Sequence, residues 1–276
     1  MNFNELNLSP ELLRAVEDMG YTQTTSIQEK TIPVMLQGLD LIGQSQTGTG
    51  KTAAFGLPLI QSIVPSDKKR PQALIMCPTR ELSIQVAEEL RKFAKYTEGV
   101  RTVTIYGGQP ISVQIRELKS GADIIVGTPG RIKDHIDRHT LKFEDLKVLV
   151  LDEADEMLNM GFREEIEDIL SYLPSERQTV MFSATMPQPI LNLTEAYMKD
   201  PEFIKIKTSE MTVSTIEQIL YETNQGTKQD LLLQLLEIYR PELSMVFCNT
   251  KKMVDDIASL LLSKGYGAAA IHGDMK

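Results

Sequence analysis

The chain has 276 residues, of which 42% are hydrophobic and 24% are charged, an ordinary balance for one large or two smaller globular domains. Its formal net charge of −9 disfavours charge-driven binding of nucleic acid. It leaves room for a protein that holds a nucleic-acid backbone with amides, hydroxyls and a few arginines. No apolar run approaches the roughly 18 residues of a membrane span, and the first five residues lack the start of a signal peptide, so we expect a cytoplasmic location.

Helices are predicted to alternate with short apolar strands over most of the chain. Ser9-Pro10-Glu11 predicts a helix start, because Ser caps the helix, Pro suits its first position and Glu favours its dipole. Buried strands are predicted at residues 39–43, 73–77, 103–106, 124–126, 148–151 and 180–182. Continuously apolar runs are typical of strands buried on both faces. The repeated strand–helix units predict an α/β fold with a doubly wound parallel sheet.

A second α/β unit is predicted after a polar stretch near residue 208. We expect a first domain at 1–207, a linker at 208–215 and part of a second domain at 216–276. The second unit is predicted to contain strands at 216–223, 244–248 and 267–271 and helices at 228–239 and 251–264. About 60 residues make a marginal core, and parallel sheets usually have more strands than this.

A glycine-rich loop follows the first predicted strand and precedes a predicted helix. It reads Ser45-Gln46-Thr47-Gly48-Thr49-Gly50-Lys51-Thr52. Glycines let the backbone curl so that its N–H groups face phosphate oxygens, and the helix adds its positive end. Lys51 would reach the β and γ phosphates, and the Thr52 hydroxyl would ligate Mg²⁺. Ser45 stands where the general pattern has Gly. The loop predicts a P-loop NTPase that binds a nucleoside triphosphate.

Two carboxylates, Asp152 and Glu153, follow the strand predicted at 148–151. Ligands of open α/β sheets bind at the carboxyl ends of the strands. Asp152 would hold the Mg²⁺, and Glu153 would orient or deprotonate the attacking water. Taken alone, the pair would sooner indicate an acidic helix cap, since carboxylates favour helix N-termini. Beside the phosphate-binding loop, it favours hydrolysis of the nucleotide.

The run Asp152-Glu153-Ala154-Asp155 resembles the namesake motif of bacterial-type DEAD-box ATP-dependent RNA helicases of superfamily 2. The resemblance implies RecA-like domains and the cofactors ATP and Mg²⁺. It implies that Gln28 pairs with the adenine edge and that Tyr21 stacks on the base, with Phe3 as the upstream aromatic residue. Thr24 stands where proline is usual in the family.

Further runs resemble the family's contacts with RNA. The segments implied to bind the backbone of single-stranded or locally unwound RNA are Pro78-Thr79-Arg80, Gly107-Gly108 and Thr128-Pro129-Gly130-Arg131. Ser183-Ala184-Thr185 resembles the run that couples hydrolysis to unwinding, so Ser183 and Thr185 join the catalytic candidates. Each run alone could be only a helix cap or a turn. Protein partners are left open.

The resemblance also implies motifs of the second domain. Val246-Phe247-Cys248-Asn249-Thr250 resembles the first of them, but the arginine-finger motif does not occur in these residues. Because an arginine finger changes phosphoryl-transfer rates by ~10³–10⁵, we expect weak turnover by this chain alone. Two other functions stay open: an ATP-gated RNA clamp whose hydrolysis is dispensable, and an ATPase that acts on another nucleic acid.

Overall fold

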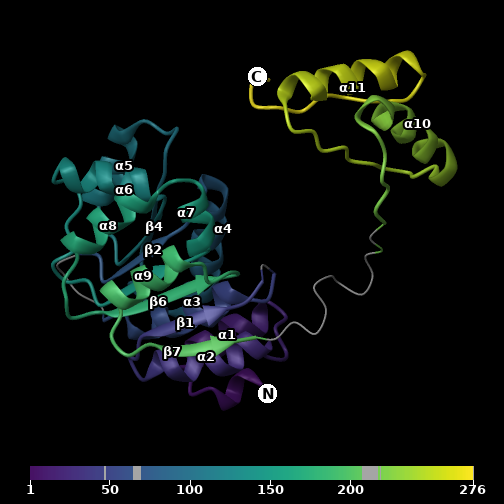
Figure 1. Cartoon of the computed structure of the whole chain (residues 1–276). Coiled ribbons are helices and arrows are strands. Elements are labelled where there is room, and N and C mark those ends of the chain that lie inside the picture. Colours follow the sequence, from purple (N-terminus) through teal and green to yellow (C-terminus); the bar gives the residue numbers. More distant parts are fainter. Residues whose placement is uncertain (47, 65–69, 207–216, 218, 276) are drawn as a thin grey trace. The chain divides into compact units, whose positions relative to one another are not determined.

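The computed structural model describes residues 1–276 except 47, 65–69, 207–216, 218 and 276 (Figure 1). The chain divides into two compact units, Met1–Ser209 and Glu210–Lys276. Within the described ranges, no helix is long and apolar enough to cross a membrane. The predicted linker lies outside the described residues, so the domain limits remain predictions.

Unit 1 is built on a seven-stranded sheet with the order β3-β4-β2-β5-β6-β1-β7, in which every neighbouring pair is parallel. The strands are β1 Leu41–Gln44, β2 Ala73–Met76, β3 Thr102–Ile105, β4 Ile124–Gly127, β5 Val148–Leu151, β6 Gln178–Ser183 and β7 Glu202–Lys205. The predicted RecA-like, doubly wound parallel sheet is confirmed. The sequence did not predict β7, a short edge strand that is largely exposed and has charged residues at both ends.

Helices cover both faces of this sheet. They are α1 Pro10–Asp18, α2 Ser26–Leu36, α3 Lys51–Ser62, α4 Arg80–Phe93, α5 Ile111–Lys119, α6 Pro129–Asp137, α7 Ala154–Asn159, α8 Arg163–Tyr172 and α9 Gln188–Tyr197, with 3₁₀ turns at Phe3–Glu5 and Ala94–Tyr96. The predicted cap is present, since the Ser9 hydroxyl accepts from the Leu12 N–H.

The core has two layers, because successive side chains of a strand point to opposite faces. In β2, Ile75 packs in the layer that includes α1 to α4, whereas Leu74 and Met76 pack in the layer that includes α6 to α9. Strands buried on both faces must be apolar throughout, which is the pattern by which the sequence revealed them.

Unit 2 contains the two predicted helices, α10 Lys228–Tyr239 and α11 Lys251–Ser263. The three predicted strands are wrong for the described residues, which form no ladder at 217, 219–223, 244–248 or 267–271. A strand needs a neighbour for its backbone hydrogen bonds. Even in unit 1, β1 and β2 are separated by β5 and β6, which come later in the chain, and the described part of unit 2 supplies no such later strands.

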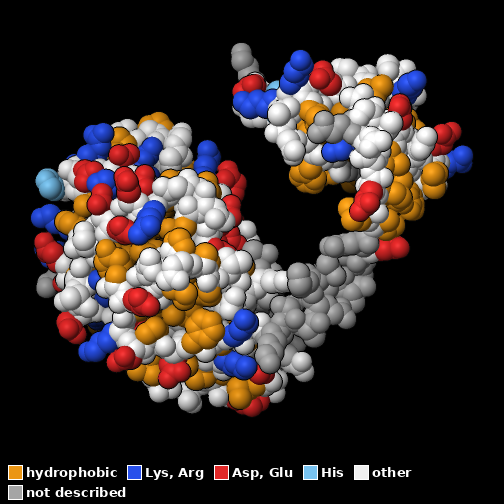
Figure 2. Space-filling model, in the orientation of Figure 1, with side chains coloured by type: hydrophobic (Ala, Val, Ile, Leu, Met, Phe, Trp, Pro, Cys, Tyr) orange, Lys and Arg blue, Asp and Glu red, His pale blue; other side chains and the backbone are white. Residues whose placement is uncertain are grey.

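The same segments expose large apolar side chains, as the hydrophobic surface of unit 2 in Figure 2 illustrates. The exposed fractions are 77% for Met245, 88% for Phe247 and 86% for Ile271. On the visible face of unit 1, acidic and basic side chains are interspersed with hydrophobic ones (Figure 2). In open α/β sheets such as that of unit 1, ligands bind at the carboxyl ends of the strands.

Candidate functional site

The glycine-rich loop connects β1 to the start of α3. Gly48 and Gly50 have φ values of +77° and +88°, a backbone region that glycine enters without steric cost. Thr49 Oγ1 donates to the Gln46 carbonyl at 3.0 Å and contacts Ser45 Oγ at 3.2 Å. Thr47 lies outside the described residues. These contacts hold the loop curled in front of the N-terminus of α3, where a phosphate group is favoured.

Lys51 and Asp152 are buried at the base of this site, with exposed fractions of 7% and 3%. Within the described residues, neither Lys51 Nζ nor Asp152 Oδ1 has a hydrogen-bond partner. Buried polar atoms are normally paired, so these two atoms have unused bonding capacity. Burial raises the pKa of Asp152 to about 6, the charge of Lys51 opposes this, and Glu153 adds to it. A bound cation would suit the Asp152 carboxylate, and a bound anion would suit Lys51.

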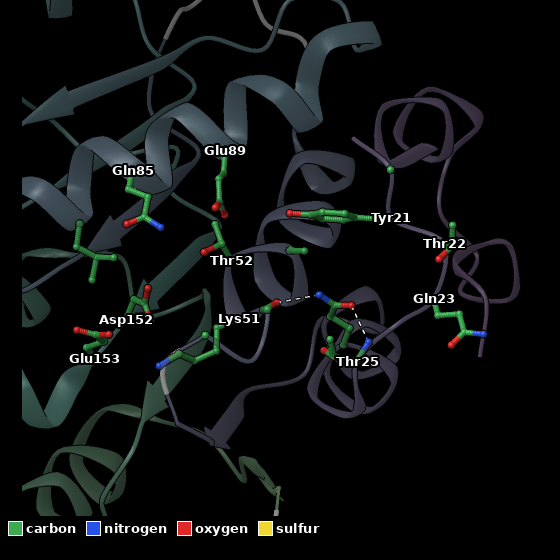
Figure 3. Close-up of a pocket in the computed structure, with 16 residues that line it drawn as sticks. Tyr21, Thr22, Gln23, Thr25, Lys51, Thr52, Gln85, Glu89, Asp152 and Glu153 are labelled. Carbon is green, nitrogen blue, oxygen red and sulfur yellow. Dashed lines mark hydrogen bonds between the residues drawn. The ribbon is translucent and has the colours of Figure 1, made fainter. Parts of the chain in front are cut away.

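Glu153 lies beside Asp152, at the N-cap of α7, with a left-handed backbone (φ +54°). Such a conformation costs a non-glycine residue roughly 1–2 kcal/mol, and residues held in it cluster at functional sites. Figure 3 shows Asp152 and Glu153 on one side of the pocket and the Lys51 side chain extending toward that side. The structure therefore brings together the three predicted residues that would act on the terminal phosphate.

These residues line a cavity of about 600 Å³, within the range of pockets for small molecules. Beyond the glycine-rich loop, its wall is formed by residues 20–23 with Thr25 and Gln28, and by Gln85 and Glu89 of α4 (Figure 3). The sequence analysis missed Gln85 and Glu89. Their spacing of four places them on one face of a helix, but nothing in the sequence indicated that this face meets a ligand.

The aromatic candidates have different positions. Tyr21 lines the pocket and is 38% exposed. Its ring stacks on Phe3, with centroids 6.3 Å apart, and meets Phe93 edge-on at 6.4 Å. Phe3 is buried, at 4% exposure, and is not among the residues that line the pocket. Phe3 therefore supports Tyr21, and only Tyr21 is placed to stack on a base.

Gln28 is buried and is bonded at both ends of its amide. Its Oε1 accepts from the Thr25 N–H at 2.9 Å, and its Nε2 donates to the Gly50 carbonyl at 3.0 Å. The first bond belongs to the capping box of α2. The second connects this helix to the glycine-rich loop. Reading of adenine by Gln28 remains a prediction.

Ser183 and Thr185 connect β6 to α7 outside the pocket. Ser183 Oγ donates to the Thr185 carbonyl at 2.7 Å. The N–H and hydroxyl of Thr185 donate to Asp155 Oδ2 at 2.9 and 2.7 Å. Burial acts to raise the pKa of Asp155, but the hydrogen bonds from Thr185 outweigh it and lower the pKa. Neither residue lines the pocket, so the contacts seen here position Asp155, and the catalytic role expected of Ser183 and Thr185 remains a prediction.

The predicted RNA-binding segments follow β2, β3 and β4, which are adjacent in the sheet. The Thr128 N–H donates to the Ile105 carbonyl at 3.1 Å, and the Cys77 N–H donates to the Gly127 carbonyl at 2.9 Å. The structure thus brings the three segments side by side. We call this edge, formed by residues 78–80, 107–108 and 128–131, the strand-end platform.

The residues of the strand-end platform differ in exposure. Arg80, Gly107 and Gly108 are exposed, whereas Pro78 and Pro129 are buried. The Arg80 guanidinium lies over the Tyr106 ring, 5.0 Å from its centroid. The Thr79 hydroxyl caps α4 by accepting from the Leu82 N–H at 3.2 Å. Exposed glycine amides, an exposed arginine and two helix N-termini are groups that bind phosphates without reading bases.

Arg131 departs from the expected arrangement. Its side chain is only 14% exposed, and its Nη1 donates to the Gln109 carbonyl and to Gln114 Oε1 at 2.9 and 3.1 Å. Gln114 and His135, both buried, complete this cluster. Neither residue could be predicted as part of a site from the sequence, because an isolated polar residue in an amphipathic helix does not indicate which residue it contacts.

Comparisons with known proteins agree with this geometry. Residues 25–193 match the DEAD/DEAH box helicase family. The chain is 54% identical to the DEAD-box ATP-dependent RNA helicase CshA of Geobacillus kaustophilus, over 99% of this chain and 58% of that protein. It is 51% identical to the protein of the same name from Bacillus subtilis, over 100% of this chain and 55% of that protein. The chain thus spans about half the length of the curated relatives it matches.

A solved structure gives the same result for the fold. The crystal structure of a DEAD box protein from the hyperthermophile Methanococcus jannaschii superposes with a TM-score of 0.73 at 44% identity, over 100% of this chain and 74% of that one. The glycine-rich loop, the carboxylate pair after β5 and the parallel sheet occur here in one arrangement. The chain therefore belongs to the DEAD/DEAH box helicase family, and its Asp152-Glu153-Ala154-Asp155 run is the DEAD form of the motif.

Proposed function

We propose that unit 1 is the ATP- and RNA-binding part of an ATP-dependent RNA helicase. The observation that carries this proposal is the pair of buried atoms without hydrogen-bond partners in the described structure, Lys51 Nζ and Asp152 Oδ1, at the base of a cavity of about 600 Å³. The names of the curated relatives, ATP-dependent RNA helicases, support it.

The donor set fits a magnesium nucleotide. Among the described residues, no group of three or more His, Cys, Asp or Glu could hold a metal ion by itself. Mg²⁺ commonly takes one or two protein ligands together with substrate phosphates and water, and Asp152 and Thr52 would be those ligands. When bound, Mg²⁺ neutralises charge that develops on the phosphates. Lys51 would bind the phosphates, and Glu153 would orient the attacking water and take its proton.

RNA would bind across the strand-end platform. Its exposed groups suit phosphates and 2′-hydroxyls, which is consistent with a preference for RNA that depends little on sequence. Closure of a second domain on ATP and RNA would complete the helicase. We propose that these 276 residues alone turn over ATP slowly, because the arginine-finger motif is not among them.

The proposal is tested first by nucleotide binding. Lys51→Ala removes a charged donor, so it is expected to weaken binding of ATP–Mg²⁺ by about tenfold or more. Lys30→Ala makes the same change on an exposed position of α2 away from the pocket and serves as the matched control. Equal ATP affinity in the wild type and in Lys51→Ala would refute the assignment of the nucleotide site.

Steady-state ATP turnover, measured with and without single-stranded RNA, tests whether hydrolysis depends on RNA. Stimulation by RNA that disappears in Lys51→Ala would support an RNA-dependent ATPase. Stimulation by matched single-stranded DNA to the same extent would favour an ATPase for another nucleic acid. If Glu153→Gln retains ATP-dependent RNA binding and the biological activity, the protein acts as a clamp and hydrolysis is dispensable.

A further inference from the structure

We infer that Arg131 is a positioning residue that holds the RNA-facing loop 106–110 in place, and that its guanidinium does not itself contact an RNA phosphate. The inference deepens the proposed function and rests on its assignment of RNA to the strand-end platform. It replaces the expectation, drawn from the motif alone, that Arg131 binds the RNA backbone.

The first observation is the direction of the Arg131 side chain. At 14% exposure, its guanidinium is directed toward protein acceptors. Its Nη1 donates to the Gln109 carbonyl at 2.9 Å and to Gln114 Oε1 at 3.1 Å, and its Nε lies 3.5 Å from Asp134 Oδ2. Two of the three guanidinium nitrogens, Nη1 and Nε, thus face protein acceptors, and Asp134 balances the charge, so this side chain has less to offer a phosphate than an exposed arginine has.

Gln114, like Arg131, forms hydrogen bonds with the loop 106–110. Gln114 of α5 is fully buried, at 0% exposure. Its Nε2 donates to the Tyr106 carbonyl at 2.9 Å and to Gln109 Oε1 at 2.8 Å. The side chains of Arg131 and Gln114 therefore hold the backbone of the loop from two sides, at Tyr106 and at Gln109. Gly107 and Gly108, the predicted phosphate contacts, lie between these two points.

His135, one turn after Arg131 on α6, completes the cluster. Its Nε2 lies 3.1 Å from Gln114 Oε1, and its Nδ1 lies 2.8 Å from Thr140 Oγ1. Gln114 Oε1 can only accept, so the hydrogen-bond pattern assigns the ring proton to Nε2. Arg131 and His135 thus both donate to one oxygen, which fixes the orientation of the Gln114 amide and directs its Nε2 toward the loop.

Arg80 shows the contrasting arrangement on the same platform. It is exposed, and an ideal Cβ built on Gly108 would lie 3.7 Å from its Nη1. Arg80 thus stands beside the loop where a phosphate bound by the glycine amides would lie. The two arginines of the platform therefore differ in role: Arg80 would contact RNA, and Arg131 keeps the loop ready to do so.

This arrangement has a thermodynamic consequence for binding. A glycine pair loses more backbone freedom on ordering than other residues do. Contacts that order the loop before RNA arrives remove that cost from the binding step. Loss of Arg131 would therefore lower RNA affinity while leaving the number of protein–phosphate contacts unchanged.

The salt dependence of RNA binding separates the two roles. For a single strand, each phosphate contact contributes about 0.7 to the slope of log affinity against log salt. We would measure binding of a fluorescent single-stranded RNA to the full chain, with ATP–Mg²⁺, between about 50 and 200 mM KCl. Arg80→Ala is expected to lower the slope by about 0.7. Arg131→Lys keeps the charge but not the planar fork, so it should weaken binding by at least about fivefold at an unchanged slope.

Gln114→Leu provides a second variant, since it removes no charge. It should weaken RNA binding as Arg131→Lys does, with the slope and the affinity for ATP unchanged. The inference is overturned if Arg131→Lys binds RNA like the wild type, or if Arg131→Gln lowers the slope as Arg80→Ala does. If Arg80→Ala changes neither affinity nor slope, the assignment of RNA to the platform fails instead. Should Gln114→Leu not fold, Arg131→Lys still decides the question.

Discussion

Gln28 connects the N-terminus of α2 to the glycine-rich loop, and its replacement by Glu tests what that connection does. The substitution preserves the acceptor for the Thr25 N–H, so the capping box of α2 is kept. It removes the donor to the Gly50 carbonyl, now 3.0 Å away, and places a carboxylate oxygen against that carbonyl. The packing here is tight, because an ideal Cβ on Gly50 would lie 2.4 Å from Gln28 Nε2.

The expected loss of ATP affinity follows from the broken hydrogen bond between Gln28 and the Gly50 carbonyl. Gln28 is 4% exposed, so water cannot readily replace the lost donor. Leaving a buried acceptor unpaired costs about 1–3 kcal/mol. If the glycine-rich loop must regain its conformation to bind phosphates, that energy appears in the binding step, and ATP affinity falls by about 5- to 150-fold.

The assay compares three ligands, ATP, GTP and inorganic tripolyphosphate, by calorimetry with Mg²⁺ present. If Gln28 acts by holding the loop, Gln28→Glu weakens all three by the same factor. If Gln28 reads adenine, the loss is confined to ATP. Gln85→Glu is the matched control, because it adds the same charge to the same cavity from α4. Wild-type affinity for all three ligands in Gln28→Glu would refute both roles.

Three further predictions concern the stability of unit 1. Gly56→Ala places a Cβ 2.8 Å from Leu90 Cδ2 between α3 and α4, so it should destabilise the fold by about 1–3 kcal/mol in urea denaturation, and an unchanged midpoint would contradict this. Asp40→Ala leaves the N–H groups of Thr179 and Lys199 without their acceptor. Each loss costs about 1–3 kcal/mol, and a midpoint equal to that of the wild type would be inconsistent with the contacts. Burial lowers the pKa of His135 from 6.5 to about 4, helped by the charge of Arg131. Because the unfolded chain binds the extra proton between these values, stability falls as the pH falls through this window, by at most about 1.4 kcal/mol per pH unit. His135→Asn should flatten that part of the stability profile, and an unaltered profile would show that another group titrates there.

The sequence predicts those strands of this fold whose burial is visible in the residue types of one short segment. The strand 148–151 is apolar at every position, which only a strand covered on both faces requires. The edge strand β7 gave no such signal, since Glu202 and Lys205 bound it and only Phe203 and Ile204 lie between. Whether a segment of unit 2 forms a strand depends on neighbouring strands that are distant in sequence. The pattern of apolar residues within one segment does not show whether such neighbours are present.

The same distinction holds for the site. The run from Ser45 to Thr52 is contiguous, so its chemistry could be predicted from one window of sequence. Gln114 and His135 lie on different helices and meet only through the packing of α5 and α6. The motif that contains Arg131 indicated its location in the platform. It did not indicate that the guanidinium is directed inward, because side-chain direction depends on what the neighbouring helix presents.

Helix α4 links the strand-end platform to the cavity of unit 1. Its first residue, Arg80, belongs to the strand-end platform, and Glu89, nine residues later, lines the cavity proposed to bind the nucleotide. At 1.5 Å per residue these positions are about 14 Å apart along one rigid element. A tilt of about 5° pivoted at the cavity would move Arg80 by roughly 1 Å. A ligand in the cavity that tilted α4 would thus displace Arg80 at the other end of the helix as well.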